Sequence, residues 1–168
     1  MSKRISVFRS LEAGDHNRAA FQTVLDQWPV PYEELTIPTR FGATSVIACG
    51  PGQAPPVVVL HPGDSQAPIW IQNIRVLSQS FRVYAVDVIG ELNKRIRNRP
   101  IRSHRRFMEW LADLFDGLLI ENADVIGNSD GWFFALETAL YLPRRARRSH
   151  LKGIPEASAI SIRERLPV

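Results

Sequence analysis

Three short strand-like runs, each followed by a longer helical pattern, constrain the fold of this chain more than any other feature. The runs are "VVVL" at 57–60, "FRVYAVDVIG" at 81–90 and "ADVI" at 123–126. A short, wholly apolar run such as the first is typical of a parallel strand that is buried on both faces. The alternation predicts an α/β fold with a doubly wound, mostly parallel sheet, right-handed crossovers and flanking helices.

Helical patterns follow the three strands at 69–80, 105–119 and 131–142. In the second, apolar residues recur at a spacing that places them on one helical stripe, and Pro143 closes the third. In sheets of this kind, functional sites form at the carboxyl ends of the strands. The loops that follow the strands are therefore the places where we expect chemistry.

The segment before these strands predicts a helix and a hairpin. Phe21, Leu25 and Trp28 recur at helical spacing within 15–28, so this segment predicts an amphipathic helix. The stretches 33–40 and 43–50 are typical of two short strands joined in a hairpin.

A chain of 168 residues suits one domain with a single sizeable core. We therefore expect one domain over 1–168, with an N-terminal helical extension at 1–31, a core at 32–143 and a divergent basic tail at 144–168. The N-terminus has no apolar signal region and no run reaches membrane-spanning length, so we expect no membrane association.

Cysteine and histidine usage excludes several kinds of site. The single cysteine, Cys49, cannot form an internal disulfide and fits a reducing cytoplasm. No cysteine pair and no His-x-x-x-His spacing points to a metal site, and we expect no cofactor.

The net charge of +4 is concentrated in arginine clusters at 93–106 and 143–150. Such clusters can bind nucleic acid or an anionic surface. They can equally be a solvated loop and a helix end, where cations oppose the helix dipole. Because no aromatic residues interleave the arginines, we favour the second interpretation and expect no nucleic-acid partner.

Two motifs with chemical meaning lie at the predicted strand ends. Residues 123–132 read "ADVIGNSDGW", which places Gly-x-Ser-x-Gly between a strand and a helix. Gly127 and Gly131 would allow the tight turn, Ser129 would project above the sheet, and the Asp130 N–H would lie at a helix N-terminus, where negative charge is favoured.

The second motif is "VVVLHPGDS" at 57–65, a strand followed by His-Pro-Gly. A backbone N–H from such a loop forms the other half of an oxyanion hole in this class of motif.

With both motifs in this order, the stretch from about Tyr32 to Pro143 resembles the N-terminal half of the α/β-hydrolase fold, in its esterase-like branch. The resemblance implies a partial hydrolase fold preceded by the N-terminal helix and hairpin. It also implies that Ser129 is the nucleophile, and that Pro62, Gly63 and the Asp130 amide form the oxyanion hole. His61 would belong to the oxyanion loop rather than act as the base, and Asp87 would be a structural carboxylate.

The acid and base that such a serine needs are not evident. In this fold the chain order is serine, acid, histidine, and the only histidine after Ser129 is His150. We regard His150 as a weak base candidate, because it follows the elbow helix before any predicted strand returns to the site. Trp132 and Leu119 also stand where the family usually has small residues. These departures suggest a truncated or frame-altered hydrolase.

The missing half would leave the strand at 123–126 as an apolar sheet edge. Edges of that kind pair with other chains or aggregate. We therefore expect a homo-oligomer formed across this edge, poor solubility, or cover from the tail segment 158–162.

Three functions are compatible with the sequence. The first is a serine hydrolase that cleaves a small carboxylic ester through an acyl-enzyme at Ser129, with a base supplied from elsewhere. The second is a non-catalytic hydrolase-like fragment or interaction module. The third is a basic nucleic-acid-binding protein.

Overall fold

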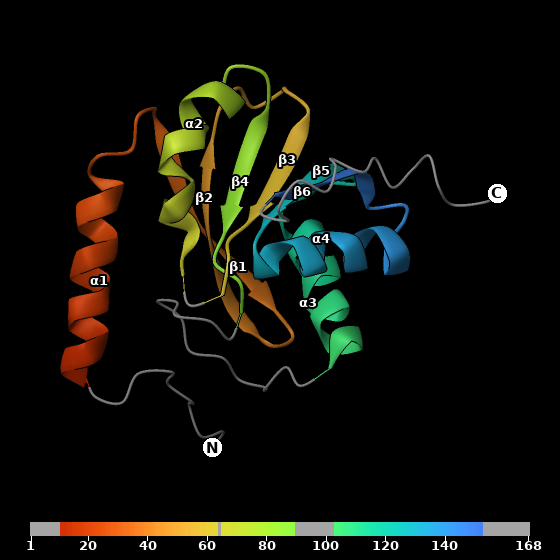
Figure 1. Cartoon of the computed structure of the whole chain (residues 1–168), viewed down its shortest axis with the longest axis horizontal. Helices are drawn as coiled ribbons and strands as arrows, with labels where there is room; N and C mark the ends of the chain where they lie inside the picture. The colour runs from red at the N-terminus through yellow and green to blue at the C-terminus, as the bar shows by residue number, and fades with distance from the viewer. Residues whose placement is uncertain (1–10, 64, 90–102, 153–168) are drawn as a thin grey trace.

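Residues 11–63, 65–89 and 103–152 are described by the computed structural model of the chain. Within them, a six-stranded sheet carries helices on both faces (Figure 1). The strands are β1 (Tyr32–Thr39), β2 (Gly42–Cys49), β3 (Pro56–Leu60), β4 (Arg82–Val86), β5 (Ala123–Asn128) and β6 (Ala146–Lys152). The helices are α1 (Leu11–Leu25), the short 3-10 helix η1 (Ala67–Trp70), α2 (Ile71–Leu77), α3 (His104–Gly117) and α4 (Asp130–Tyr141).

The strand order is β1-β2-β4-β3-β5-β6. The predicted hairpin is confirmed, because β1 pairs with β2 in antiparallel register, and β2 pairs antiparallel with β4. The strands β4, β3, β5 and β6 are parallel. This arrangement confirms the predicted mostly parallel α/β sheet with flanking helices.

The register brings the carboxyl ends of three strands to one edge of the sheet. Leu60 at the end of β3 pairs with Val86 of β4 on one side and with Gly127 of β5 on the other. The loops that follow β3, β4 and β5 therefore begin next to one another, although they lie far apart in the sequence.

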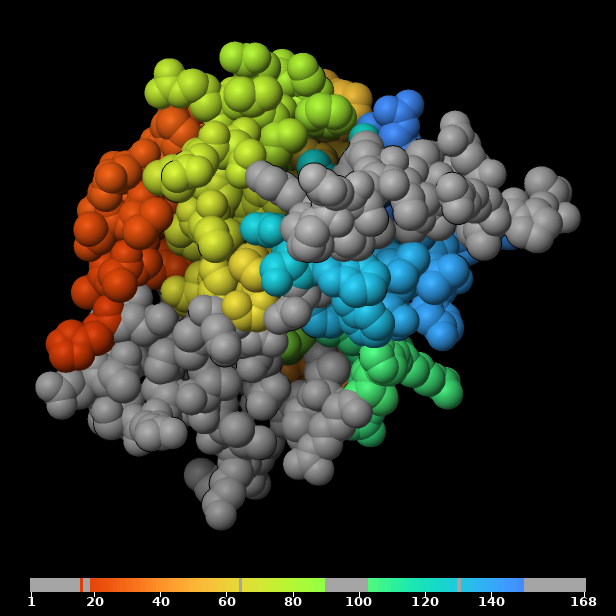
Figure 2. All heavy atoms as spheres, in the orientation of Figure 1, coloured from red at the N-terminus to blue at the C-terminus, as the bar shows by residue number. Residues whose placement is uncertain are grey.

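The two faces of the sheet carry separate hydrophobic cores. Val57 and Val59 pack with α1 and α2, whereas Val58 and Leu60 pack with α3 and α4. Because successive side chains of a strand point to opposite faces, a strand covered on both sides is apolar at every position. In the space-filling view α1 covers one side of the molecule and α4 lies across the other (Figure 2).

The predicted exposed edge at 123–126 is wrong, because the segment expected to be a divergent basic tail contributes the strand β6. β6 pairs with β5 from Ala123 opposite Ala146 to Asn128 opposite Lys152, with a register shift between Ala123 and Asp124. The segment 158–162 and the arginine-rich stretch 93–102 lie outside the described residues.

Polar contacts explain why β6 forms from a sequence without an apolar run. The guanidinium of Arg147 donates to both carboxylate oxygens of Asp124 on β5, at 2.9 and 2.8 Å. The Ser149 hydroxyl donates to the Ala135 carbonyl of α4 at 3.2 Å. These partners come from distant segments, so the local pattern of the tail carries no strand signal.

Among the described residues, no helix combines the length and the apolar character that crossing a membrane requires.

Candidate active site

Ser129 occupies the turn between β5 and α4 in a strained backbone conformation. Its φ is 49° and its ψ is −125°. A positive φ is uncommon for a residue with a side chain, and such conformations cost about 1–3 kcal/mol each. The surrounding structure holds this one in place, since the Trp132 N–H donates to the Ser129 carbonyl at 2.8 Å.

The side chain of Ser129 is exposed and does not cap the helix that it precedes. Ser103 provides a contrast, because it precedes α3 with an ordinary φ of −150° and its hydroxyl accepts a hydrogen bond from the Arg106 N–H. A serine before a helix usually acts as such a cap. Ser129 therefore departs from the usual helix-capping role.

Two glycines let the elbow pack closely against its neighbours. A Cβ on Gly127 would overlap the carbonyl group of Gly131, and a Cβ on Gly131 would lie 2.5 Å from the Leu60 carbonyl oxygen of β3. Both contacts involve backbone atoms, which cannot move aside as a flexible side chain can. The glycine spacing therefore brings the start of α4 against the end of β3.

The loop after β3 begins with a buried histidine. His61 is 1% exposed. Its Nε2 accepts a hydrogen bond from the Val88 N–H at 2.9 Å, and its Nδ1 lies 2.7 Å from the Pro62 carbonyl oxygen. Burial lowers the pKa of His61, and the Pro62 carbonyl opposes that shift in part. With Nε2 as acceptor and Nδ1 as donor, both ring nitrogens are already in use.

Asp87 ties the end of β4 to the helix that follows this loop. The side chain is buried, and its Oδ1 accepts a hydrogen bond from the Ala67 N–H of η1 at 2.8 Å. Its backbone N–H donates to the Ser45 carbonyl at 3.0 Å. This is the structural role that the family resemblance implied for this carboxylate.

Pro62 and Gly63 follow His61 and are half-buried, and Asp130 is the first residue of α4. The pairing of β3 with β5 brings both segments to the same edge of the sheet as Ser129. Their role as an oxyanion hole remains a prediction.

Solved structures that share this architecture include two carboxylesterases of Bacillus subtilis. Carboxylesterase CesB (YbfK) superposes with a TM-score of 0.82 at 37% identity, over 84% of this chain and 50% of that one. The naproxen esterase (carboxylesterase NP) superposes with a TM-score of 0.81 at 36% identity, over 85% of this chain and 50% of that one. The chain therefore shares the α/β-hydrolase fold over the part that these structures cover.

Sequence comparison agrees with this hydrolase fold. Carboxylesterase YbfK of Bacillus subtilis (strain 168) is 37% identical over 150 residues, which cover 89% of this chain and 51% of that protein. The 2-hydroxy-6-oxo-2,4-heptadienoate hydrolase of Pseudomonas putida is 33% identical over 108 residues, or 61% of this chain and 38% of that protein. The chain thus spans about half the length of the curated carboxylesterases of Bacillus subtilis that it matches. No family model matches the sequence.

His150 lies on a strand that returns beside the elbow, contrary to the expectation that none would. On β6 it pairs with Ile126, which precedes Ser129 by three residues. The placement of its side chain lies outside the described structure. Its role as a base therefore stays a prediction.

Glu137, a carboxylate on α4 that follows Ser129 in the sequence, contacts a different histidine, His104. Its Oε2 lies 3.5 Å from Nδ1 of His104, which also packs edge-on against Phe133 of α4. This contact joins α4 to the start of α3. Within the part of the hydrolase fold that the structure describes, no histidine makes a hydrogen bond to Ser129, and no acidic or histidine cluster could hold a metal ion.

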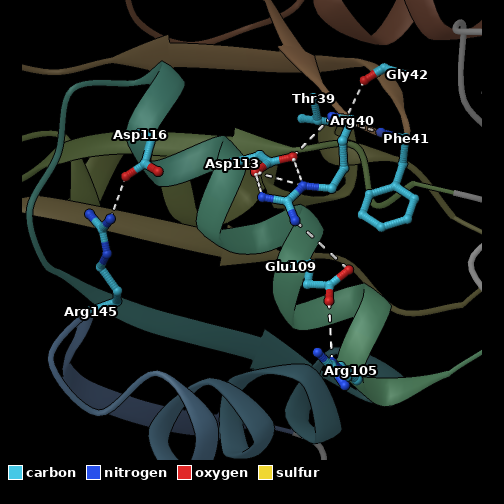
Figure 3. A network of polar contacts seen from close by, with 9 residues as sticks. All are labelled: Thr39, Arg40, Phe41, Gly42, Arg105, Glu109, Asp113, Asp116 and Arg145. Carbon is cyan, nitrogen blue, oxygen red and sulfur yellow. Dashed lines mark hydrogen bonds and ion pairs between the residues drawn. The ribbon is translucent and has the colours of Figure 1, made fainter.

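Several arginines are held in ion pairs on α3 (Figure 3). Arg40, in the hairpin turn, donates to both Asp113 oxygens, with the shortest distance 2.7 Å. Burial opposes ionisation of Asp113, but the bonds from Arg40 outweigh it and lower the pKa of this carboxyl group. Arg105 contacts Glu109 at 3.3 Å, and Arg145 pairs with Asp116. These pairs engage part of the positive charge that the sequence concentrates here.

A groove of about 650 Å³ runs beside this network. Its lining includes the apolar residues Met108, Ala112 and Leu142, together with Arg40 and Tyr141. None of its lining residues belongs to the elbow or to the loop after β3, so the groove is separate from the candidate active site.

Proposed function

We propose that this chain carries the nucleophile of a serine hydrolase that cleaves carboxylic esters. The observation that carries the proposal is the strained, exposed Ser129, held at positive φ between β5 and α4 and free of a capping role. Backbone strain that is retained at a single residue is typical of functional sites, because an ordinary turn would relax it.

The chemistry follows from the position of Ser129 at a helix N-terminus. Its Oγ attacks the ester carbonyl, and N–H donors from Asp130 and from the loop at Pro62-Gly63 stabilise the oxyanion that forms. The proton that Oγ loses passes through a base to the alcohol as it leaves, and water then releases the acid from the acyl-enzyme and returns a proton to Oγ. The names of the carboxylesterase relatives support an ester as the substrate class.

The serine needs a base, for which His150 on β6 is the candidate that this chain offers. Oxyanion stabilisation and binding alone retain part of the catalysis when triad members are removed. We therefore expect slow acylation at Ser129 in this chain even where the base is not in place.

A fluorophosphonate probe tests the proposal directly, because it phosphonylates activated serines. We expect one phosphonyl group per chain by intact mass, located on Ser129 by peptide mapping. Ser129→Ala should abolish the label. Ser103→Ala is the matched control, because Ser103 is also an exposed serine that precedes a helix. This variant should label like the wild type.

Absence of a label on folded wild-type protein would overturn the proposal. It would favour the non-catalytic alternative, in which the elbow is only an architectural feature. Equal labelling of wild type and Ser129→Ala would also count against it, because the reactive group would then lie elsewhere.

A further inference from the structure

The buried imidazole of His61 connects two loops that the sheet brings together. Its Nε2 accepts from the Val88 N–H, which lies in the segment after β4 and is 27 residues away in sequence. Its Nδ1 faces the carbonyl of Pro62, the next residue in its own loop. The side chain therefore bridges the end of β4 and the loop that carries Pro62 and Gly63.

The backbone of His61 also meets the elbow helix. A Cβ placed on Gly131 would lie 3.0 Å from the His61 carbonyl oxygen. The first turn of α4 thus rests against the same residue whose side chain holds Val88. A displacement of His61 would move the loop at Gly63 relative to Ser129.

We propose that His61 is a positioning residue for the oxyanion loop: its hydrogen bond to the Val88 N–H fixes where the Gly63 N–H lies relative to Ser129. This inference rests on the proposed function, since it assigns the loop at Gly63 to the esterase site. It assigns His61 no proton transfer and no contact with the substrate.

The hydrogen bond requires one particular form of the imidazole. Nε2 can accept from Val88 only when it carries no proton, so the ring is neutral with its proton on Nδ1, which then donates to Pro62. An apolar side chain of similar size would leave the buried Val88 N–H without this acceptor. A glutamine can place an amide oxygen near the position of Nε2 and so retain the acceptor.

NMR tests the positioning role without any need for activity, because hydrogen exchange of the Val88 amide reports its bond to His61 and the amide chemical shift of Gly63 reports the position of the loop. We expect exchange of the Val88 amide in His61→Leu to be faster than in wild type by about tenfold, the equivalent of one lost buried hydrogen bond, and the Gly63 amide shift to change. His61→Gln should recover most of the protection. Val59→Ala is the control, because it removes buried side-chain volume from β3 but keeps the His61 bond. It should leave the Gly63 amide shift closer to wild type than His61→Leu does.

The rate of fluorophosphonate labelling at Ser129 tests the consequence for the site. We expect the order wild type, His61→Gln, His61→Leu, with the last slower by about tenfold or more. A wild-type Gly63 amide shift in His61→Leu would overturn the inference, as would an equal change of that shift in Val59→Ala. If His61→Leu does not fold, ¹⁵N NMR of the wild-type imidazole decides, because a proton on Nε2 would overturn the inference.

Failure of the two ideas can be told apart. If wild type shows the Nδ1-protonated ring and the Gly63 amide shift depends on His61, but Ser129 is never labelled, the proposed function fails and His61 still positions the loop. If Ser129 is labelled at the same rate in wild type and in folded His61→Leu, the proposed function stands and the positioning inference fails.

Discussion

Leu119 holds a backbone conformation that leucine seldom adopts. It follows α3 with a φ of 57°, and its side chain is 93% exposed. Helices commonly end in this left-handed conformation, but the residue that adopts it is usually glycine. Leu119 stands where the hydrolase family tends to have glycine, and the structure shows that this position requires the left-handed conformation that glycine adopts readily.

We expect Leu119→Gly to stabilise the protein by about 0.5–1 kcal/mol. The substitution relieves about 1–2 kcal/mol of left-handed strain, and the greater freedom of glycine in the unfolded chain offsets part of this gain. Urea unfolding measures the free energy of unfolding. Leu118→Gly is the control, because Leu118 has a φ of −84° and packs against the core. It should destabilise, and a gain at both positions would contradict the explanation.

His61 makes the stability of the fold depend on pH. Burial lowers its pKa in the folded protein, whereas in the unfolded chain it titrates near its ordinary value of about 6.5. Between these two values the unfolded state binds the proton and the folded state does not. The free energy of unfolding contributed by His61 is therefore present above about pH 6.5 and is lost as the pH falls below it.

We expect wild type to lose more stability than His61→Gln between about pH 7 and about pH 5, as measured by urea unfolding at each pH. His16→Gln, at an exposed position on α1, is the control. This variant should lose as much stability as wild type does over the same pH range. An identical pH dependence in wild type and His61→Gln would show that His61 is not the residue responsible.

At the scale of single elements, β6 is held by a charged pair rather than by an apolar face. The Asp124 side chain is 4% exposed and that of Arg147 is 36% exposed, with 2.8 Å between Nη2 and Oδ2. The hydrogen bonds that Arg147 donates to Asp124 raise the pKa of Arg147, so this arginine stays charged. A buried carboxylate with a bidentate partner fixes the register of the strand that carries the partner.

Removing one member of this pair should loosen β6. We expect Arg147→Ala to cost about 2–3 kcal/mol, less than for a fully buried pair because the arginine is partly in water. Arg148→Ala is the control, because Arg148 is the exposed neighbour of Arg147, and it should change the free energy of unfolding little. The double variant Asp124→Val with Arg147→Val should recover part of the lost free energy of unfolding, since no unpaired charge then remains. Equal costs for the two single variants in urea unfolding would contradict this role.

At the scale of the whole molecule, the sheet ends differently on its two sides. β1 closes one side as part of a hairpin, and β6 is the last strand on the other side within the described residues. The hydrophobic core that contains Val57 and Val59 also includes Phe21 and Leu25 of α1, which are buried against the sheet. The N-terminal helix is therefore part of the packed structure that supports the site.

We propose self-association across β6, in place of the β5 edge that the sequence suggested. An end strand presents backbone groups that can pair with a second copy of the chain. Sedimentation velocity over a range of protein concentrations should show a dimer that grows with concentration. A single monomer species at every concentration would contradict the proposal.

Much of the site can be predicted from short stretches of sequence. The spacing of Gly127, Ser129 and Gly131 depends only on the local turn and on small residues at its flanks, so the sequence alone predicts the elbow. The strand at 57–60 is also predictable from local sequence, because a strand that is buried on both faces is apolar at every position. Helix α4 and the hairpin follow from the same local signals.

Local sequence signals are sufficient to place the strands and helices of the core, and to place Ser129 on the turn between one strand and one helix. Long-range contacts were needed to show that 146–152 forms a strand, because Arg147 finds its partner 23 residues away on β5. The same is true of the bond between His61 and Val88, which joins two strand ends that are neighbours only in the folded sheet. Local periodicity records which face of an element is buried, but a polar residue whose partner is distant in sequence leaves no periodic trace.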